Sequence, residues 1–145
     1  MKSKIYEFDP VIYPFPIHIT KEWDEDEIKK KYKALNASDE EVAFTDELSH
    51  TQDTTARVIN VVDAESGMMY YLVVLFRPQY IGAGISAHEA VHLANAYLQY
   101  LGFSCPSAYN DEPYAYFVQW VTNCIYSVVS NMQDAIDAMK GKLLE

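Results

Sequence analysis

Two histidines and one glutamate stand at a spacing that can bind and use a metal ion. His88, Glu89 and His92 form the pattern H-E-x-x-H. In a helix, residues i and i+4 lie on one face, one turn apart, so both imidazoles can reach a single ion. Glu89 projects about 100° further round the helix, where it can hold the attacking water without being a ligand. The pattern therefore predicts a bound Zn2+ ion with Glu89 as general base.

The same residues have a simpler interpretation, a pair of core histidines whose hydrogen bonds are satisfied. Two imidazoles and a carboxylate are costly to bury in an apolar helix unless they are paired or bound to a metal. Two of the four histidines of the chain lie in this motif, on a segment that independently reads as a helix. We therefore favour the metal site over the core-histidine interpretation.

A catalytic zinc site needs a third protein ligand and an open position for water. Asp111 and Glu112 follow His92 by 19 and 20 residues, at the predicted start of the next helix. A carboxylate in the first turn of a helix is stabilised by the helix dipole. We expect Glu112 to be the third ligand because its side chain reaches further, with Asp111 as helix cap or as the alternative ligand.

The motif, followed 20 residues later by Glu112, resembles the gluzincin branch of zinc metallopeptidases, the thermolysin-like arrangement. The resemblance covers roughly residues 56–129. It implies His88, His92 and Glu112 as zinc ligands, Glu89 as general base, and a peptide or protein as substrate. It also implies that the strand predicted over residues 68–76 is the edge against which an extended peptide lies.

The chain departs from the larger gluzincins at one position close to the predicted site. Four residues after the ligand glutamate they commonly carry an acidic residue that steadies a ligand histidine, whereas this chain has Tyr116. Tyr116, or Tyr114, is the candidate to bring a phenol to the reaction centre instead. His50 is a further candidate for stabilising an oxyanion, although a solvated loop histidine is the simpler interpretation.

Composition limits the partners. The chain has 145 residues and a net charge of −10, with no Lys or Arg between Arg77 and Lys140. We expect no nucleic-acid partner, because such proteins carry a basic face. A positive site in the basic-free stretch would need a metal ion or a protonated histidine. No uncharged apolar run reaches the roughly 18 residues of a membrane span, and no apolar signal segment opens the sequence.

We therefore expect a cytoplasmic protein with no membrane contact, in which Cys105 and Cys124 are buried thiols rather than a disulfide. The alternative to a hydrolase is a non-catalytic interaction or assembly protein with a structural or vestigial metal site. Small H-E-x-x-H proteins encoded by phages or mobile elements are what the chain resembles in that case.

The predicted elements that position these residues form one α+β domain over residues 1–145. We expect a zincin-like fold, in which a small antiparallel sheet with a β-hairpin packs on two main helices. Residues 4–20, with three prolines, predict an edge strand or extended arm. A short charged helix over residues 24–35 and a loop over residues 36–55 complete the acidic N-terminal part.

The remaining residues, 56–145, carry the predicted core. Apolar runs over residues 56–63 and 68–76 flank turn residues and predict the hairpin. Residues 85–100 are apolar nearly all round and predict a central, buried helix, which Gly102 follows as a C-cap. Residues 113–140 repeat apolar side chains at helical spacing and predict one long C-terminal helix.

Overall fold

Seven strands, four α-helices and one short 3-10 helix make up the part of the chain that the structure describes. The computed structural model describes residues 4–21, 24–36, 38–43, 54–104 and 106–144. In chain order the elements are β1 (Ile5–Phe8), β2 (Ile17–Thr20), α1 (Glu25–Lys31), β3 (Tyr32–Leu35), β4 (Glu41–Val42), β5 (Ala56–Asp63), β6 (Met69–Leu75), η1 (Pro78–Tyr80), α3 (Ala83–Tyr100), α4 (Glu112–Val129), α5 (Gln133–Ala138) and β7 (Gly141–Leu144).

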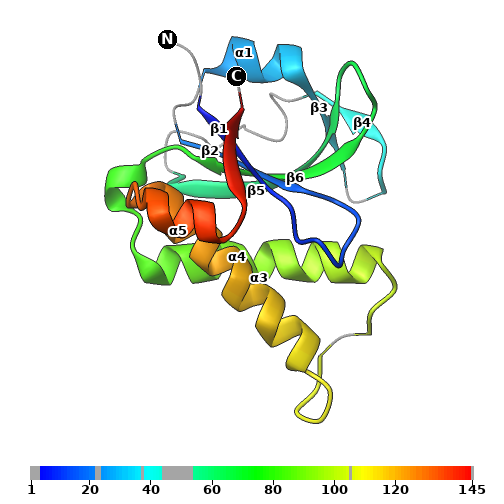
Figure 1. The fold of residues 1–145 in the computed structure, drawn as a ribbon. Helices are drawn as coiled ribbons and strands as arrows, with labels where there is room; N and C mark the ends of the chain where they lie inside the picture. Colours follow the sequence, from blue (N-terminus) through cyan, green and yellow to red (C-terminus); the bar gives the residue numbers. More distant parts are fainter. Residues whose placement is uncertain (1–3, 22–23, 37, 44–53, 105, 145) are drawn as a thin grey trace.

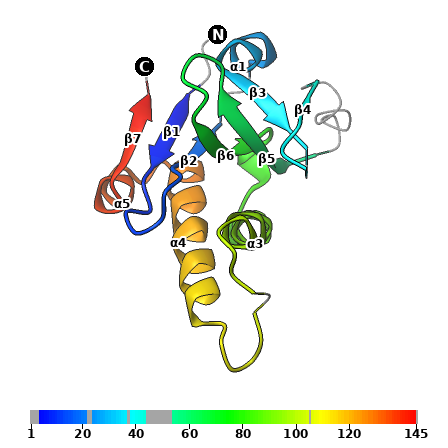
Figure 2. The same cartoon turned by 90° about the vertical axis from the view of Figure 1, so that its right-hand side faces the viewer.

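The strands form one open sheet in the order β4-β3-β5-β6-β2-β1-β7. Strands β2 and β6 are parallel, and the other neighbouring pairs of described strands are antiparallel. Helices α3 and α4 lie against one face of the sheet and α1 lies on the other (Figures 1 and 2). The α+β class is therefore confirmed, whereas the zincin-like arrangement remains a prediction.

Strand β6 runs through the middle of the sheet and is buried on both faces. Tyr71, Val73 and Leu75 belong to the core under α3 and α4, and Leu72 and Val74 belong to the core under α1. A continuous apolar run is what a strand covered on both sides requires. Because β6 pairs with both β5 and β2, the expectation that this strand forms an edge of the sheet is wrong.

The predicted hairpin is confirmed as β5 and β6. The two strands pair from Ala56 opposite Leu75 to Val62 opposite Met69. The Asp63 carboxylate closes the turn by accepting hydrogen bonds from the backbone of two turn residues. Gly67 then adopts φ +73°, a left-handed conformation that glycine reaches without steric cost.

The N-terminal segment forms two interior strands rather than an edge strand or arm. Strand β1 lies between β2 and β7, and β2 lies between β6 and β1. Pro10, Pro14 and Pro16 all fall in the connection between β1 and β2, where their missing N–H groups remove no ladder hydrogen bond. The edge-strand prediction is wrong because the prolines interrupt the loop and not the strands.

The charged helix predicted over residues 24–35 is shorter than expected. Asp24 caps α1 by accepting a hydrogen bond from the Glu27 backbone at 3.2 Å. The chain leaves the helix at Tyr32, which is buried with Ala34 in the alternating pattern of β3. In the predicted loop that follows, β4 adds a short edge strand; residues 44–53, including His50, lie outside the described residues.

Helix α3 agrees with the predicted central helix and begins two residues earlier. It ends in a Schellman motif, in which Gly102 at φ +89° donates to the Gln99 carbonyl and Phe103 donates to the Leu98 carbonyl. The expectation that it is buried all round is wrong on one face, where both motif histidines are exposed.

The long C-terminal helix predicted over residues 113–140 is broken. Helix α4 ends at Val129, and Asn131 turns the chain at φ +54°, a conformation that asparagine tolerates better than most residues. The short helix α5 follows, and β7 then pairs with β1. Gly141 opens β7 where a Cβ atom would lie 2.3 Å from the Phe8 ring, so a larger residue there would force neighbouring side chains to shift.

The two longest helices, α3 and α4, have 18 residues each. Neither these nor any other helix within the described ranges combines the length and the hydropathy needed to cross a membrane. Cys124 is a free thiol buried in α4, as expected, whereas Cys105 lies outside the described residues.

Candidate functional site

Helix α3 places the two motif histidines side by side on its exposed face. The Nε2 atoms of His88 and His92 are 3.2 Å apart, and their ring centroids are 4.8 Å apart. Two nitrogen ligands at about 2.0–2.1 Å from a tetrahedral ion lie about 3.3–3.4 Å from each other. The imidazole pair therefore fits two coordination positions of one zinc ion, and it equally allows a direct hydrogen bond between the rings.

Glu89, between the two exposed histidines in sequence, is buried, with 8 % of its surface exposed. Burial raises the pKa of its carboxyl above the ordinary value, while the charges of His88 and Arg57 act in the opposite direction. The assignment of Glu89 as general base stays a prediction. Its carboxyl is available to a molecule in the cavity described next.

A cavity of about 750 Å³ lies between α3 and β5. Helix α3 contributes one face to it, and Glu89 and His92 lie on that face. The opposite wall is the first half of β5, where five successive residues contribute, and the turn between β3 and β4 closes one end. The lining residues are Leu35, Asn36, Asp39, Ala56, Arg57, Val58, Ile59, Asn60, Tyr71, Glu89, His92, Ala96, Gln99 and Tyr100.

Arg57 is the lining residue that the sequence alone did not single out. The stretch around the motif lacks basic residues, so a positive site there was expected to need a metal ion or a protonated histidine. The hairpin instead brings Arg57 from β5 to the cavity, close enough to influence the Glu89 carboxyl electrostatically. Only the pairing of strands and helix, which sequence spacing does not reveal, could have located it.

Glu112 and Tyr116 do not join this cavity. Both line a second cavity of about 590 Å³, whose other walls come from Phe117, Trp120 and the β1–β2 connection. Helix α4 starts at Glu112, at the end of the helix that projects away from the sheet (Figure 2). Asp111, the alternative ligand, is exposed at the N-cap of α4 and makes no side-chain cap hydrogen bond.

The described residues hold no group of three His, Cys, Asp or Glu side chains placed to bind a metal ion. The structure thus brings together His88, His92 and Glu89 but leaves the third ligand without a position beside them. Tyr114, the other phenol considered, lines a small separate cavity at the end of α3. The assignments of Glu112 as ligand and of Tyr116 as catalytic phenol stay predictions.

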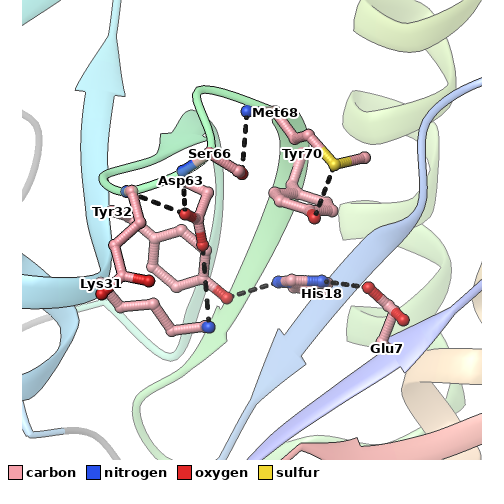
Figure 3. A network of polar contacts seen from close by, with 9 residues as sticks. Glu7, His18, Lys31, Tyr32, Asp63, Ser66, Met68 and Tyr70 are labelled. Carbon is pink, nitrogen blue, oxygen red and sulfur yellow. Dashed lines mark hydrogen bonds and ion pairs between the residues drawn. The ribbon is translucent and has the colours of Figure 1, made fainter.

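A second set of polar side chains lies on the opposite side of the sheet (Figure 3). His18 on β2 is 2 % exposed, and its Nε2 atom lies 3.0 Å from the Glu7 carboxylate on β1. Its Nδ1 atom hydrogen-bonds the Tyr32 hydroxyl, and its ring stacks on Tyr70 at a centroid distance of 4.0 Å. Lys142 on β7 pairs with Glu7 at 3.1 Å.

The protonation of this network follows from its partners. A carboxylate only accepts hydrogen bonds, so His18 Nε2 carries the proton and Nδ1 accepts from the Tyr32 hydroxyl. Burial lowers the pKa of His18, with Glu7 opposing the shift, and raises that of Tyr32. Burial would raise the pKa of Glu7, but its hydrogen bonds to His18 and Lys142 outweigh that effect and lower it. The hydrogen bonds and the ion pair of this network join β1, β2, β3 and β7, and the stacked Tyr70 ring adds β6.

Comparison of the chain with protein-family models found no match. Comparison with curated proteins and with solved structures found none either.

Proposed function

We propose that this protein is a zinc-dependent hydrolase that cleaves peptides or proteins. In this proposal His88 and His92 bind the zinc ion and Glu89 is the general base. The observation that carries the proposal is the 3.2 Å separation of the two histidine Nε2 atoms on the helix that also supplies a buried carboxyl to the adjoining cavity. Zinc in such a site polarises the scissile carbonyl and lowers the pKa of water. The remaining chemistry belongs to the side chains of the chain.

Glu89 is the proton carrier in this proposal. Glu89 lines the cavity together with His92, and in the proposed reaction its carboxylate takes the proton of the attacking water and returns it to the leaving amine. Leu93 and Tyr97 follow Glu89 by one and two turns on nearly the same side of α3, and both are fully buried and anchor the helix in the core. That packing holds the histidines and the carboxyl on one rigid element, as a reaction centre needs.

The substrate would lie along β5 rather than β6. Strand β3 pairs with β5 only from Val61 to Asp63. Among described strands, none pairs with that side of residues 56–60, and all five of these residues line the cavity. An extended peptide can add to such an open strand edge through its main-chain hydrogen bonds. This edge takes the role that the resemblance implied for the strand over residues 68–76.

The test compares hydrolysis by the zinc-loaded wild type with that by Glu89→Gln. A pool of peptides of mixed sequence is incubated with each protein, and new amino termini are identified by mass spectrometry. We expect Glu89→Gln to lower the rate at least about a hundredfold while zinc stays bound, as for loss of a general base. Glu65→Gln, which removes a carboxylate from the exposed hairpin turn, is the matched control and should cleave normally.

An unchanged rate for Glu89→Gln would contradict the assignment of Glu89. No cleavage by zinc-loaded wild-type protein of any peptide in the pool would count against the hydrolase and for the alternative below.

The alternative is a non-catalytic interaction or assembly protein, and the second cavity supports it. Its walls are mainly apolar, and Ile12 and Tyr116 are 81 % and 67 % exposed. Exposed apolar surface of this kind commonly marks a protein contact. In that case Ile12→Asp should abolish association with a partner or a second copy in sedimentation measurements, while Glu89→Gln should leave association unchanged.

A further inference from the structure

The end of the α3 cavity beside the β3–β4 turn holds more hydrogen-bond acceptors than the described residues there satisfy. Asn60 on β5 donates from Nδ2 to the Asp39 carboxylate at 3.4 Å. Its Oδ1 atom is buried and has no hydrogen-bond partner among the described residues. Reversing the amide would set its oxygen against the carboxylate, so the Asp39 contact fixes this orientation.

Asp39 is held in place by the turn around it. Its backbone is left-handed at φ +58° and donates to the Asn36 carbonyl at 3.0 Å. The Asn36 side-chain oxygen accepts from the backbones of Ser38 and Glu40. The Asp39 carboxylate is exposed and forms no ion pair with the described lysines and arginines. This end of the cavity is therefore a fixed carboxylate beside an unsatisfied buried oxygen.

An unsatisfied buried acceptor is costly to the folded protein, and such a group calls for an explanation. A ligand that brings several N–H donors and a positive charge would pair with the exposed Asp39 carboxylate, and it would satisfy the Asn60 oxygen as well once a small side-chain movement opened that atom to the cavity. A protonated amine carries three donors and a guanidinium five, and neither accepts hydrogen bonds. Such charge-assisted hydrogen bonds to a carboxylate are stronger than neutral ones.

The distance from the reaction centre follows from the strand and helix geometry. Asn60 lies opposite Tyr71, whose hydroxyl donates to the Ala96 carbonyl at 3.4 Å. Glu89 precedes Ala96 by seven residues of α3, which is roughly 10 Å along the helix axis. An extended chain covers that length in about three residues.

We propose that Asp39 and Asn60 form a subsite for a protonated amine or guanidinium of the ligand. This inference rests on the proposed function, from which we take the ligand to be a peptide. The positive group is either a Lys or Arg side chain or a free amino terminus, and the two share the same recognition chemistry.

The test measures binding, which does not depend on cleavage. Three six-residue peptides are titrated into zinc-loaded Glu89→Gln protein and followed by NMR. One has a free amino terminus and no basic residue; the second is acetylated and carries one Lys; the third is acetylated and carries norleucine in its place. We expect at least one charged peptide to bind roughly tenfold more tightly than the neutral one, and which one identifies the source of the charge.

Two variants assign the effect to the subsite. Asp39→Asn should remove the preference for the charged peptide and leave the neutral peptide unaffected. Asn60→Leu should weaken the charged peptide while keeping or raising the melting temperature, because it removes the unsatisfied oxygen. Asp134→Asn, which removes an exposed carboxylate from α5, is the control for net charge and should bind like the parent.

Equal affinity for the three peptides, including no binding of any, would overturn the subsite. So would a preference for charge that survives both Asp39→Asn and Asn60→Leu. Charge-dependent binding without hydrolysis by the wild type would leave the subsite intact and contradict the hydrolase. Hydrolysis by the wild type with no preference for the charged peptides would support the hydrolase and contradict the subsite.

Discussion

Replacement of Tyr32 by phenylalanine isolates one hydrogen bond of the His18 network. The Tyr32 hydroxyl donates to His18 Nδ1, and both side chains are almost fully buried, at 1 % and 2 % exposed. Tyr32→Phe keeps the ring and removes only the donor. His18 cannot offer its other tautomer, because Nε2–H is engaged by the Glu7 carboxylate at 3.0 Å. Nδ1 is then left as a buried acceptor without a partner.

The expected cost is the desolvation of that acceptor, about 1–3 kcal/mol in the free energy of unfolding. For a chain of this size, each kcal/mol corresponds to roughly 2–4 °C in melting temperature. The matched control is Tyr70→Phe. Tyr70 is also buried and stacks on the same imidazole, but the Met68 sulfur, at 3.7 Å, is the one partner of its hydroxyl among the described residues. Tyr70→Phe should therefore cost less than about 0.5 kcal/mol.

Urea unfolding at pH 7.5, followed by far-UV circular dichroism, measures both variants against the wild type. Tyr32→Phe should lower the unfolding midpoint clearly and Tyr70→Phe hardly at all. Equal midpoints for the two variants would show that the Tyr32 hydroxyl contributes no more than the Tyr70 hydroxyl, and the tautomer assigned to His18 would then be wrong.

Two further predictions concern pH and the last strand. Because burial lowers the pKa of His18 in the folded protein, the unfolded chain binds the proton more readily; stability should be complete above the unfolded value of about 6.5 and fall as the pH drops below it. Urea midpoints at pH 7.5, 6.0 and 5.0 measure this, and a slope in His18→Gln as steep as in the wild type would contradict it. Gly141→Ala should destabilise by about 1–3 kcal/mol, because the added Cβ would lie 2.3 Å from Phe8 Cε1 and 2.8 Å from Ile136 Cγ2. Gly84→Ala in α3 meets no atom within 4 Å and should be neutral or stabilising; an equal loss in both by differential scanning calorimetry would exclude the clash as the cause.

Local patterns in the sequence predicted the hairpin and the motif helix. Apolar and polar residues do not alternate in the run around Val73 and Leu75. The run is nevertheless rich in β-branched residues and bounded by a turn, which is typical of a buried strand. Sequence patterns predict an element less well where pairing with a distant strand determines whether it forms. Residues 141–144 form β7 only because β1 lies beside them, and no local pattern contains that information.

The break of the C-terminal helix has a local cause with a weak signal. Asn131 adopts the left-handed conformation at the end of α4, but asparagine also occurs inside helices at moderate cost. Apolar residues continue at helical spacing across the break in α5, so periodicity alone predicted one helix. The tertiary fold favours two helices over one continuous helix, because the chain must turn after α4 for β7 to reach the sheet.

The residues of the candidate site also divide into those that a local pattern predicts and those that long-range pairing brings to the site. His88, Glu89 and His92 could be predicted because one helix fixes their relative positions. Arg57 and Asn60 reach the cavity through strand pairing, which their sequence positions do not reveal. Separation along the chain also suggested Glu112 as a partner of the histidines, yet it lines another cavity, because α4 starts away from the sheet.

The zinc content of purified protein tests the proposed centre most directly. Elemental analysis and zinc titration compare the wild type with His88→Ala, His92→Ala and Glu112→Ala. We expect one zinc ion per wild-type chain and a sharp loss in both histidine variants; loss in Glu112→Ala as well would restore Glu112 as the third ligand, and retention would exclude it. A wild-type protein that binds no zinc when the ion is supplied, or that keeps it after both histidines are replaced, would contradict the metal centre.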